Sequence, residues 1–312
     1  MQEHEPMRAV QIVEVGARDG LQNEPDIVAT ADKLALITRM IDAGVRRLEV
    51  ASFVNPKRVP QMADGEAVIA QLPDRRDVSY IGLCLNKRGV MRAIESRAGN
   101  KRGVDEAGCV LVASDTFGQK NQGQTIAQGI AENRDMLRLA RENGLVAQVT
   151  VSAAFGCPFE GPVAAETVVR CAAEMAEAGA EEIALADTIG VAVPAQVSDL
   201  FGRVREAVGP AMRLRAHFHN TRGTGIANAW AAYQAGVDVL DSSIGGLGGC
   251  PFAPKATGNI ATEDLIYLLE RSGVGGGVDL SKAISVNHWF EGVLGRPLPS
   301  MVGKAGPAPG MH

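Results

Sequence analysis

Short apolar runs rich in β-branched residues alternate with longer amphipathic stretches along most of the chain. The runs have the length of buried strands, and the stretches repeat apolar residues at helical spacing. The runs predict strands at Val10–Val15, Arg47–Ala51, Val78–Cys84, Gly108–Ala113, Val146–Ser152, Glu182–Ala186, Arg213–His217 and Val237–Ser242. The stretches predict helices at Ala31–Ala43, Gln61–Gln71, Lys87–Arg97, Thr125–Glu142, Ala164–Ala178, Pro194–Val208, Gly223–Gln234 and Ala261–Glu270.

This repeated strand–helix alternation predicts a parallel sheet, and its eight units favour closure into an α/β fold of the (β/α)8 TIM-barrel type. An open, doubly wound sheet is the alternative. That fold normally carries a glycine-rich phosphate turn after its first strand, whereas this chain continues into Gly16-Ala17-Arg18-Asp19-Gly20. We therefore assign residues 8–272 to a barrel catalytic domain. Residues 273–312 form a C-terminal extension with a short helix near Lys282–Leu294 and an end that we expect to be partly mobile.

Polar residues follow nearly every predicted strand. They include Arg18, Asp19, Ser52, Asn86, Ser114, Asp115, Ser152, Asp187, Thr188, His217, His219, Ser242 and Ser243. A single serine at such a place is an ordinary helix cap. Their recurrence is informative, because barrel enzymes build their active sites from the carboxyl ends of the strands.

His217 and His219 form an H-x-H pair at the end of the seventh predicted strand. Side chains two residues apart on a strand point to the same face, so both imidazoles can reach one metal ion. Asp19 would add a carboxylate from the first strand, and such an O,N,N ligand set suits Mg²⁺ or Mn²⁺. The alternative for the pair is two histidines that are only hydrogen-bonded. Asn259, before the last predicted helix, is a fourth ligand or a cap.

Two charged residues accompany these ligands. Arg18 supplies a fixed positive charge that suits a carbonyl or enolate oxygen, although a loop salt bridge is the plain alternative. Glu49 interrupts the apolar run Leu48-Glu49-Val50, and if it is buried, the plain alternative is an ion pair with Arg18 or Arg47. We expect it to orient Arg18 or a metal-bound water. Asp187 ends the sixth strand as either a catalytic group or a helix cap.

Cys250 lies in the loop Gly245-Gly246-Leu247-Gly248-Gly249-Cys250-Pro251 after the eighth strand. The glycines allow the loop to move as a lid would, and a thiol on it can donate or accept a proton. A phosphate-binding nest is the competing interpretation. The other cysteines, Cys84, Cys109 and Cys171, are expected to be structural, with Cys157 less clear.

Composition excludes several classes of protein. The chain has 312 residues, 46% of them hydrophobic and 21% charged, and a net charge of −5 with no basic stripe, which argues against nucleic acid as a partner. No apolar run approaches the ~18 residues that suggest a membrane span. The N-terminus lacks the pattern of a signal peptide, and the 5 cysteines are scattered. We expect a cytoplasmic protein with reduced thiols.

Several segments resemble the 3-hydroxy-3-methylglutaryl-CoA lyase family, one of a wider group of metal-dependent barrel lyases with Arg-Asp and H-x-H motifs. The matching segments are Val13–Glu24, Ser52-Phe53-Val54 with Pro60-Gln61-Met62, Gly156–Gly161, Asp187–Gly190 and the stretch from Asp241 through the cysteine loop to Asp264. They run from about residue 10 to 270.

The resemblance implies a divalent metal held by Asp19, His217, His219 and Asn259. It implies Arg18 at the thioester or enolate oxygen, Glu49 and Asp187 in support, and Cys250 as acid/base. The expected reaction is a retro-Claisen cleavage of an acyl-CoA thioester. For 3-hydroxy-3-methylglutaryl-CoA the products are acetyl-CoA and acetoacetate, which would place the enzyme in leucine degradation and ketone-body formation. A homo-oligomer, a dimer, is expected.

The chain departs from the family pattern at a few positions. Asn220-Thr221-Arg222-Gly223 stands where these lyases usually have Asp-Thr-Tyr-Gly, Thr150 stands where an aromatic residue is common, and Lys255 follows the cysteine loop. Arg222 and Lys255 would add positive charge near the site. A relative acting on another 3-hydroxy-3-carboxymethyl acyl-CoA is therefore an alternative. A Claisen-type synthase, which should lack the Cys250 loop, and a non-catalytic metal-binding barrel are weaker ones.

Overall fold

The computed structural model describes residues 8–249 and 258–309, and in this part of the chain the strands form one closed parallel barrel in the order β1 to β8. The strands are β1 Gln11–Glu14, β2 Arg47–Ser52, β3 Ser79–Cys84, β4 Glu106–Val112, β5 Val146–Ser152, β6 Glu182–Asp187, β7 Arg213–Phe218 and β8 Val239–Ser242. Pairing of β1 with β8, which sets Gln11 beside Val239, closes the ring. The predicted (β/α)8 barrel is confirmed.

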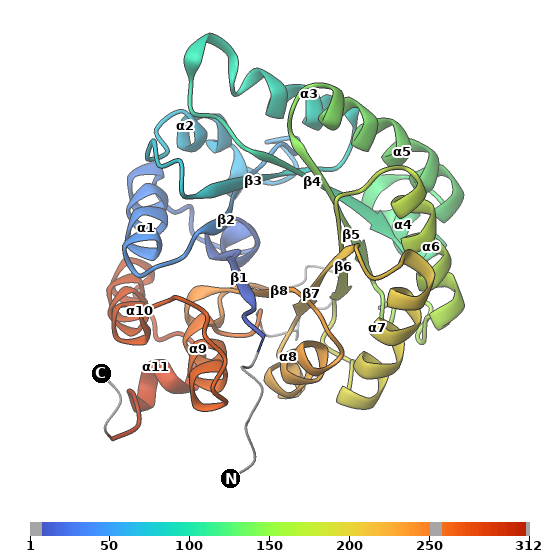
Figure 1. Cartoon of the computed structure of the whole chain (residues 1–312). Helices are drawn as coiled ribbons and strands as arrows, with labels where there is room; N and C mark the ends of the chain where they lie inside the picture. The colour runs from blue at the N-terminus through green and yellow to red at the C-terminus, as the bar shows by residue number, and fades with distance from the viewer. Residues whose placement is uncertain (1–7, 250–257, 310–312) are drawn as a thin grey trace.

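Helices surround the strands on the outside (Figure 1). They are α1 Thr30–Asp42, α2 Gly65–Ile69, α3 Lys87–Glu95, α4 Asp115–Gln122, α5 Ile126–Glu142, α6 Ala165–Glu177, α7 Pro194–Val208, α8 Gly225–Gln234, α9 Thr262–Arg271, α10 Leu280–Leu294 and α11 Met301–Ala305. None of these described helices is long and apolar enough to cross a membrane. The main hydrophobic core lies between the strands and this outer layer. A separate apolar cluster contains Val13 of β1, Val15 directly after β1, Ile81 of β3 and Val239 of β8.

Three segments differ from the sequence prediction. The predicted helix Gln61–Gln71 is a 3₁₀ turn, Pro60–Met62, followed by the short α2. Gln61 is buried. Its side-chain amide accepts a hydrogen bond from the N–H of Val28 and donates one to the carbonyl of Asp26, so this segment is held by the preceding loop. The helix α4, capped by Ser114, was missed because its polar sequence Asp115–Gln122 has little apolar periodicity. The helix α11 was missed because it has only 5 residues and lies in the Pro/Gly-rich C-terminal end.

The C-terminal extension lies against the barrel beside α1 and α9 (Figure 1). Its helix α10 confirms the helix expected near Lys282–Leu294. Asp264 of α9 accepts hydrogen bonds from Ser300 and from the backbone N–H of Val302, which fixes the start of α11. The extension begins with a glycine-rich turn, residues 273–277, which packs on the end of α1. A Cβ on Gly44 would lie 2.4 Å from the Gly277 carbonyl oxygen. Mobility of the far C-terminus stays a prediction.

Candidate active site

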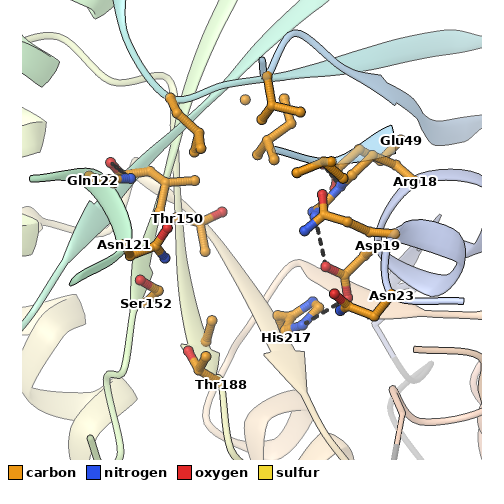
Figure 2. Close-up of a pocket in the computed structure, with 18 of the residues that line it drawn as sticks. Arg18, Asp19, Asn23, Glu49, Asn121, Gln122, Thr150, Ser152, Thr188 and His217 are labelled. Carbon is orange, nitrogen blue, oxygen red and sulfur yellow. Dashed lines mark hydrogen bonds and ion pairs between the residues drawn. The ribbon is translucent and has the colours of Figure 1, made fainter. Parts of the chain in front are cut away.

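A cavity of about 570 Å³ lies at the carboxyl ends of the barrel strands. Its lining includes residues from β2 to β8, the turn after β1 and the helix α4. Figure 2 shows Arg18, Asp19 and His217 on one side of the cavity, with Asn121, Gln122 and Thr150 facing them from the other. The polar strand ends thus meet in one place, as the sequence predicted.

His217, His219 and Asp19 are brought together in this cavity. One possible ligand atom from each lies within 4.8 Å of the others. The Nε2 atoms of both histidines are 3.9 Å from Asp19 Oδ2, a spacing that one ion can bridge because each bond to it spans about 2.0–2.3 Å. His219 Nδ1 is buried without a hydrogen-bond partner. The three residues fit a divalent cation.

Asn259 lies beside the same group. Its Nδ2 donates to Asp19 Oδ2 and to the Leu247 carbonyl, both at 2.9 Å. Its Oδ1 is buried and has no partner, which is costly unless another group binds it. It is the Nδ2 atom of Asn259 that contacts Asp19 in this structure, and the role of Asn259 as a fourth metal ligand stays a prediction.

Arg18 and Asp19 lie on a single π-helical turn, Gly16–Gly20, directly after β1. Such turns are frequent at functional sites. Gly16 is needed there because its N–H donates to the Glu14 carboxylate and a Cβ would lie 2.5 Å from that oxygen. The turn directs both Arg18 and Asp19 toward the cavity.

The guanidinium of Arg18 lies between two carboxylates. Its Nε is 2.6 Å from Glu49 Oε1 and its Nη1 is 2.7 Å from Asp19 Oδ1. Glu49 is only 2% exposed and reaches this point from β2, whose register with β3 shifts next to Glu49. The expected pairing of Glu49 with Arg18 is confirmed. The neighbouring carboxylates raise the pKa of Arg18 although burial opposes them, so its charge is fixed.

Asp241, on β8, is a site residue that the sequence analysis did not single out. Its Oδ2 is 3.0 Å from His217 Nδ1, which leaves His217 Nε2 directed at Asp19. A carboxylate on the outer nitrogen of a metal-ligating histidine fixes the tautomer and the ring orientation. The signal was available, because Asp241 is two residues after Val239, on the same face of a strand, and a carboxylate in a buried strand needs a partner.

The negative charges of Asp19 and Asp241 beside His217 favour a positively charged group at this place. Burial lowers the pKa of this imidazole, but the hydrogen bond to Asp241 and the charges of Asp19 and Asp241 outweigh burial and raise the pKa. Burial also opposes ionisation of Asp19, yet Arg18 and the two histidines hold its pKa well below the usual range. Asp19 is thus a carboxylate, the form that binds metal.

Asp187 is buried at the end of β6 but is not among the residues that line the cavity. Its two oxygens accept hydrogen bonds from the N–H groups of Val191 and Ala192, each at 2.9 Å. Burial raises its pKa despite these bonds. Asp187 shapes the loop that follows β6, and the adjacent Thr188 is the residue that faces the cavity (Figure 2).

The wall opposite the metal-ligand cluster is polar and was largely missed. Asn121 and Gln122 reach it from α4, and Thr150 and Ser152 from β5 (Figure 2). The hydroxyl of Ser152 is buried without a partner. Asn121 and Gln122 were missed because the helix α4 that carries them was not predicted.

Cys250 and Lys255 lie outside the described residues. Gly249, directly before Cys250, lines the cavity, and its carbonyl accepts a hydrogen bond from Asn23 at 2.9 Å. Arg222 donates to the carbonyl oxygens of Ile189 and Gly190 and is not among the described residues that line the cavity. The expected extra positive charge in the site therefore gains no support from Arg222.

The fold is a (β/α)8 barrel of the kind found in many enzymes, with a polar candidate site at the carboxyl ends of its strands. The family model described as HMGL-like matches residues 9–289. The chain belongs to this hydroxymethylglutaryl-CoA lyase family and is a carbon–carbon lyase.

Individual relatives cover nearly the whole chain. The (R)-citramalyl-CoA lyase of Chloroflexus aurantiacus is 44% identical and covers 96% of this chain and 96% of its own length. The hydroxymethylglutaryl-CoA lyase of Bacillus subtilis is 40% identical, over 94% of this chain and 96% of that protein. The solved HMG-CoA lyase of A. baumannii, in complex with coenzyme A and 3-methylmalate, has a TM-score of 0.91 at 38% identity and covers 97% of both chains.

Proposed function

We propose that this protein is a divalent-metal-dependent lyase that cleaves 3-hydroxy-3-methylglutaryl-CoA into acetyl-CoA and acetoacetate. The observation that carries this proposal is the convergence of Asp19, His217 and His219 beside the Arg18–Glu49 pair in one cavity. In this reaction the C3 hydroxyl loses its proton and the C2–C3 bond breaks. A ketone forms at C3, and the electron pair passes into the thioester enolate, which takes a proton at C2.

The proposed cofactor is Mg²⁺ or Mn²⁺, held by Asp19, His217, His219 and the amide oxygen of Asn259. Bound there, the ion would lower the pKa of the substrate hydroxyl and would help to orient the hydroxyl and carbonyl oxygens of the substrate. Oxygen and imidazole ligands without a thiolate favour these ions. The buried, unpartnered Oδ1 of Asn259 supports its place in the ligand set.

Arg18 is proposed to stabilise the negative charge on the thioester oxygen of the enolate. Its guanidinium is held by Glu49 and Asp19, so it needs no reorganisation when the charge develops. Glu49 thereby acts through Arg18. Asp187 is proposed to support the site by fixing the β6 loop that carries Thr188.

Cys250 is proposed to donate the proton to C2. Contrary to the expectation of a mobile glycine loop, Gly245 and Gly246 belong to a buried 3₁₀ turn, Ile244–Gly246. Exclusion of water around the thiol would prevent a competing proton transfer. Gly249, directly before Cys250 in the chain, lines the cavity. His217 is the second candidate for this proton transfer, since it lies at the same site.

A second candidate substrate is (R)-citramalyl-CoA, because a relative with that named activity is 44% identical to this chain. In that thioester a carboxylate is attached directly to C3, so cleavage gives acetyl-CoA and pyruvate. The two candidates need the same chemistry at C2 and C3, and differ in how far the carboxylate extends toward the cavity wall.

The test is an acetyl-CoA release assay with purified enzyme and a panel of thioesters that contains both candidates, with Mg²⁺, with Mn²⁺ and after chelation. The proposal expects metal-dependent release and the highest kcat/KM for 3-hydroxy-3-methylglutaryl-CoA. A higher kcat/KM for (R)-citramalyl-CoA would transfer the assignment to that substrate. Full activity after metal removal would refute the metal-dependent mechanism.

A further inference from the structure

Arg215 lies two residues before His217 on β7 and is buried inside the barrel. It is 3% exposed and lines the deep end of the cavity. Its Nε is 2.9 Å from Asp241 Oδ1, an ion pair without hydrogen-bond geometry, while the other oxygen of Asp241 is 3.0 Å from His217 Nδ1. One carboxylate therefore connects Arg215 to a proposed metal ligand.

Arg215 is itself anchored in a buried network inside the barrel. Its Nη1 contacts Gln148 Oε1, and it is 3.3 Å from Glu182 Oε1. Gln148 donates to Glu106 at 2.7 Å, and Arg47 forms ion pairs with both Glu106 and Glu182. These residues come from four strands, β2, β4, β5 and β6, so the position of Arg215 is fixed by the barrel and not by one flexible contact.

The charges in this network explain why Asp241 depends on Arg215. The network with Asp241 contains three arginines, Arg47, Arg213 and Arg215, and three carboxylates, Glu106, Glu182 and Asp241, which gives 3 − 3 = 0, so the loss of one arginine leaves one carboxylate without a balancing charge. Arg47 forms its ion pairs with Glu106 and Glu182. Without Arg215, Asp241 would be a buried carboxylate that keeps only its contact with His217, and a buried charge that loses its partner reorients or loses its charge.

We propose that Arg215 is a positioning residue of the metal site: it holds Asp241 so that this carboxylate keeps His217 oriented with Nε2 toward Asp19. The inference rests on the metal-dependent function proposed above. Arg215 acts through Asp241, in the way that partners of ligating histidines tune metal affinity elsewhere.

A purely structural role for Arg215 makes a different prediction, and Arg213 provides the matched control. Arg213 is on the same strand and also pairs with Glu182, at 3.4 Å, but its side chain is 44% exposed and it forms no ion pair with Asp241 among the described residues. Removing either arginine deletes a charge next to Glu182. Only removal of Arg215 deletes the partner of Asp241.

The experiment measures Mn²⁺ affinity by electron paramagnetic resonance on metal-stripped enzyme, with thermal unfolding of each variant as a check of folding. Arg215→Met should raise the Mn²⁺ Kd by about 10–100-fold. Arg213→Met should leave it within about twofold. In an Asp241→Asn background, Arg215→Met should add little further, because both act through the same contact.

The outcomes separate the two proposals. If the wild type binds no Mn²⁺, the metal-dependent function itself fails. If the wild type binds Mn²⁺ and Arg215→Met binds it equally well, or if the effects of Arg215→Met and Asp241→Asn simply add, only the role of Arg215 is overturned. Should Arg215→Met not fold, Arg215→Gln takes its place: it also removes the charge that pairs with Asp241 but keeps a polar side chain, and a wild-type Kd in that variant overturns the proposal.

Discussion

Replacing Arg18 with methionine tests the catalytic role of its charge most directly. Methionine keeps much of the apolar stem but removes the guanidinium that binds Glu49 at 2.6 Å and Asp19 at 2.7 Å. If that guanidinium stabilises the enolate, its loss is felt mainly in the transition state. We expect kcat to fall by about 10²–10³-fold with little change in KM.

The same substitution should also lower stability, for a separate reason. Glu49 is 2% exposed, so losing its partner leaves a buried charge unpaired, which typically costs roughly 3–5 kcal/mol. Asp19 has an 18% exposed side chain and nearby histidines, so its share of the cost is smaller. A melting temperature alone therefore cannot report on catalysis.

The double variant Arg18→Met/Glu49→Gln separates the two effects. It removes the stranded charge, so most of the lost stability should return, while kcat should stay low because the guanidinium is still absent. Steady-state acetyl-CoA release and thermal unfolding on the same samples measure both quantities. Arg18→Lys is the conservative comparison and should rescue kcat poorly, since an ammonium lacks the planar fork.

Two results would refute this reasoning. One is an Arg18→Met enzyme whose kcat lies within about threefold of the wild type, which is far from the loss expected of a charged donor. The other is a double variant that regains kcat together with stability, because activity would then depend on the integrity of the site and not on the Arg18 charge.

Three further predictions address the ligands, the thiol and pH. Exhaustive chelation should abolish turnover, and Mg²⁺ or Mn²⁺ should restore it. His217→Ala should lower the Mn²⁺ affinity measured by titration strongly and change the melting temperature little. Unchanged Mn²⁺ affinity would remove His217 from the ligand set. The Cys250→Ser variant should fold and bind metal, but its kcat should be much lower. Iodoacetamide should modify Cys250 faster than the four buried cysteines, and substrate should slow this modification. A Cys250→Ser enzyme that keeps most of its kcat excludes the thiol as proton donor. Burial raises the pKa of Glu14 to about 7 and that of Glu263 to about 8. The folded state therefore binds more protons than the unfolded state between pH ~4.5 and ~8. The free energy of unfolding should fall as pH rises through that window. Glu263→Gln should therefore raise the melting temperature at pH 8 and change it little at pH 5; equal effects at both would contradict this.

The sequence by itself determined the architecture, because the signals for a (β/α)8 barrel are local and repeated. Each strand and its following helix carry their own periodicity, and Gly44, Gly144, Gly179 and Gly236 end helices with a positive φ as their C′ positions predict. The H-x-H pair and Asp19 were also readable, since strand alternation and the position after a strand place their side chains on one end of the barrel.

Only the tertiary structure decided which polar groups meet. Asp241 reaches His217 from β8, Arg215 reaches Asp241 from β7, and Asn121 and Gln122 reach the cavity from a helix without a clear periodic signal. A residue's own position indicates at most that it needs a partner, because which groups meet depends on the closure of the barrel and the register of its strands. Asp187 makes the same point in reverse: its position suggested chemistry, but the fold turns its oxygens toward the backbone of Val191 and Ala192. Local pattern thus gives the elements, and the buried charges at their junction are arranged by packing, where each must find a partner.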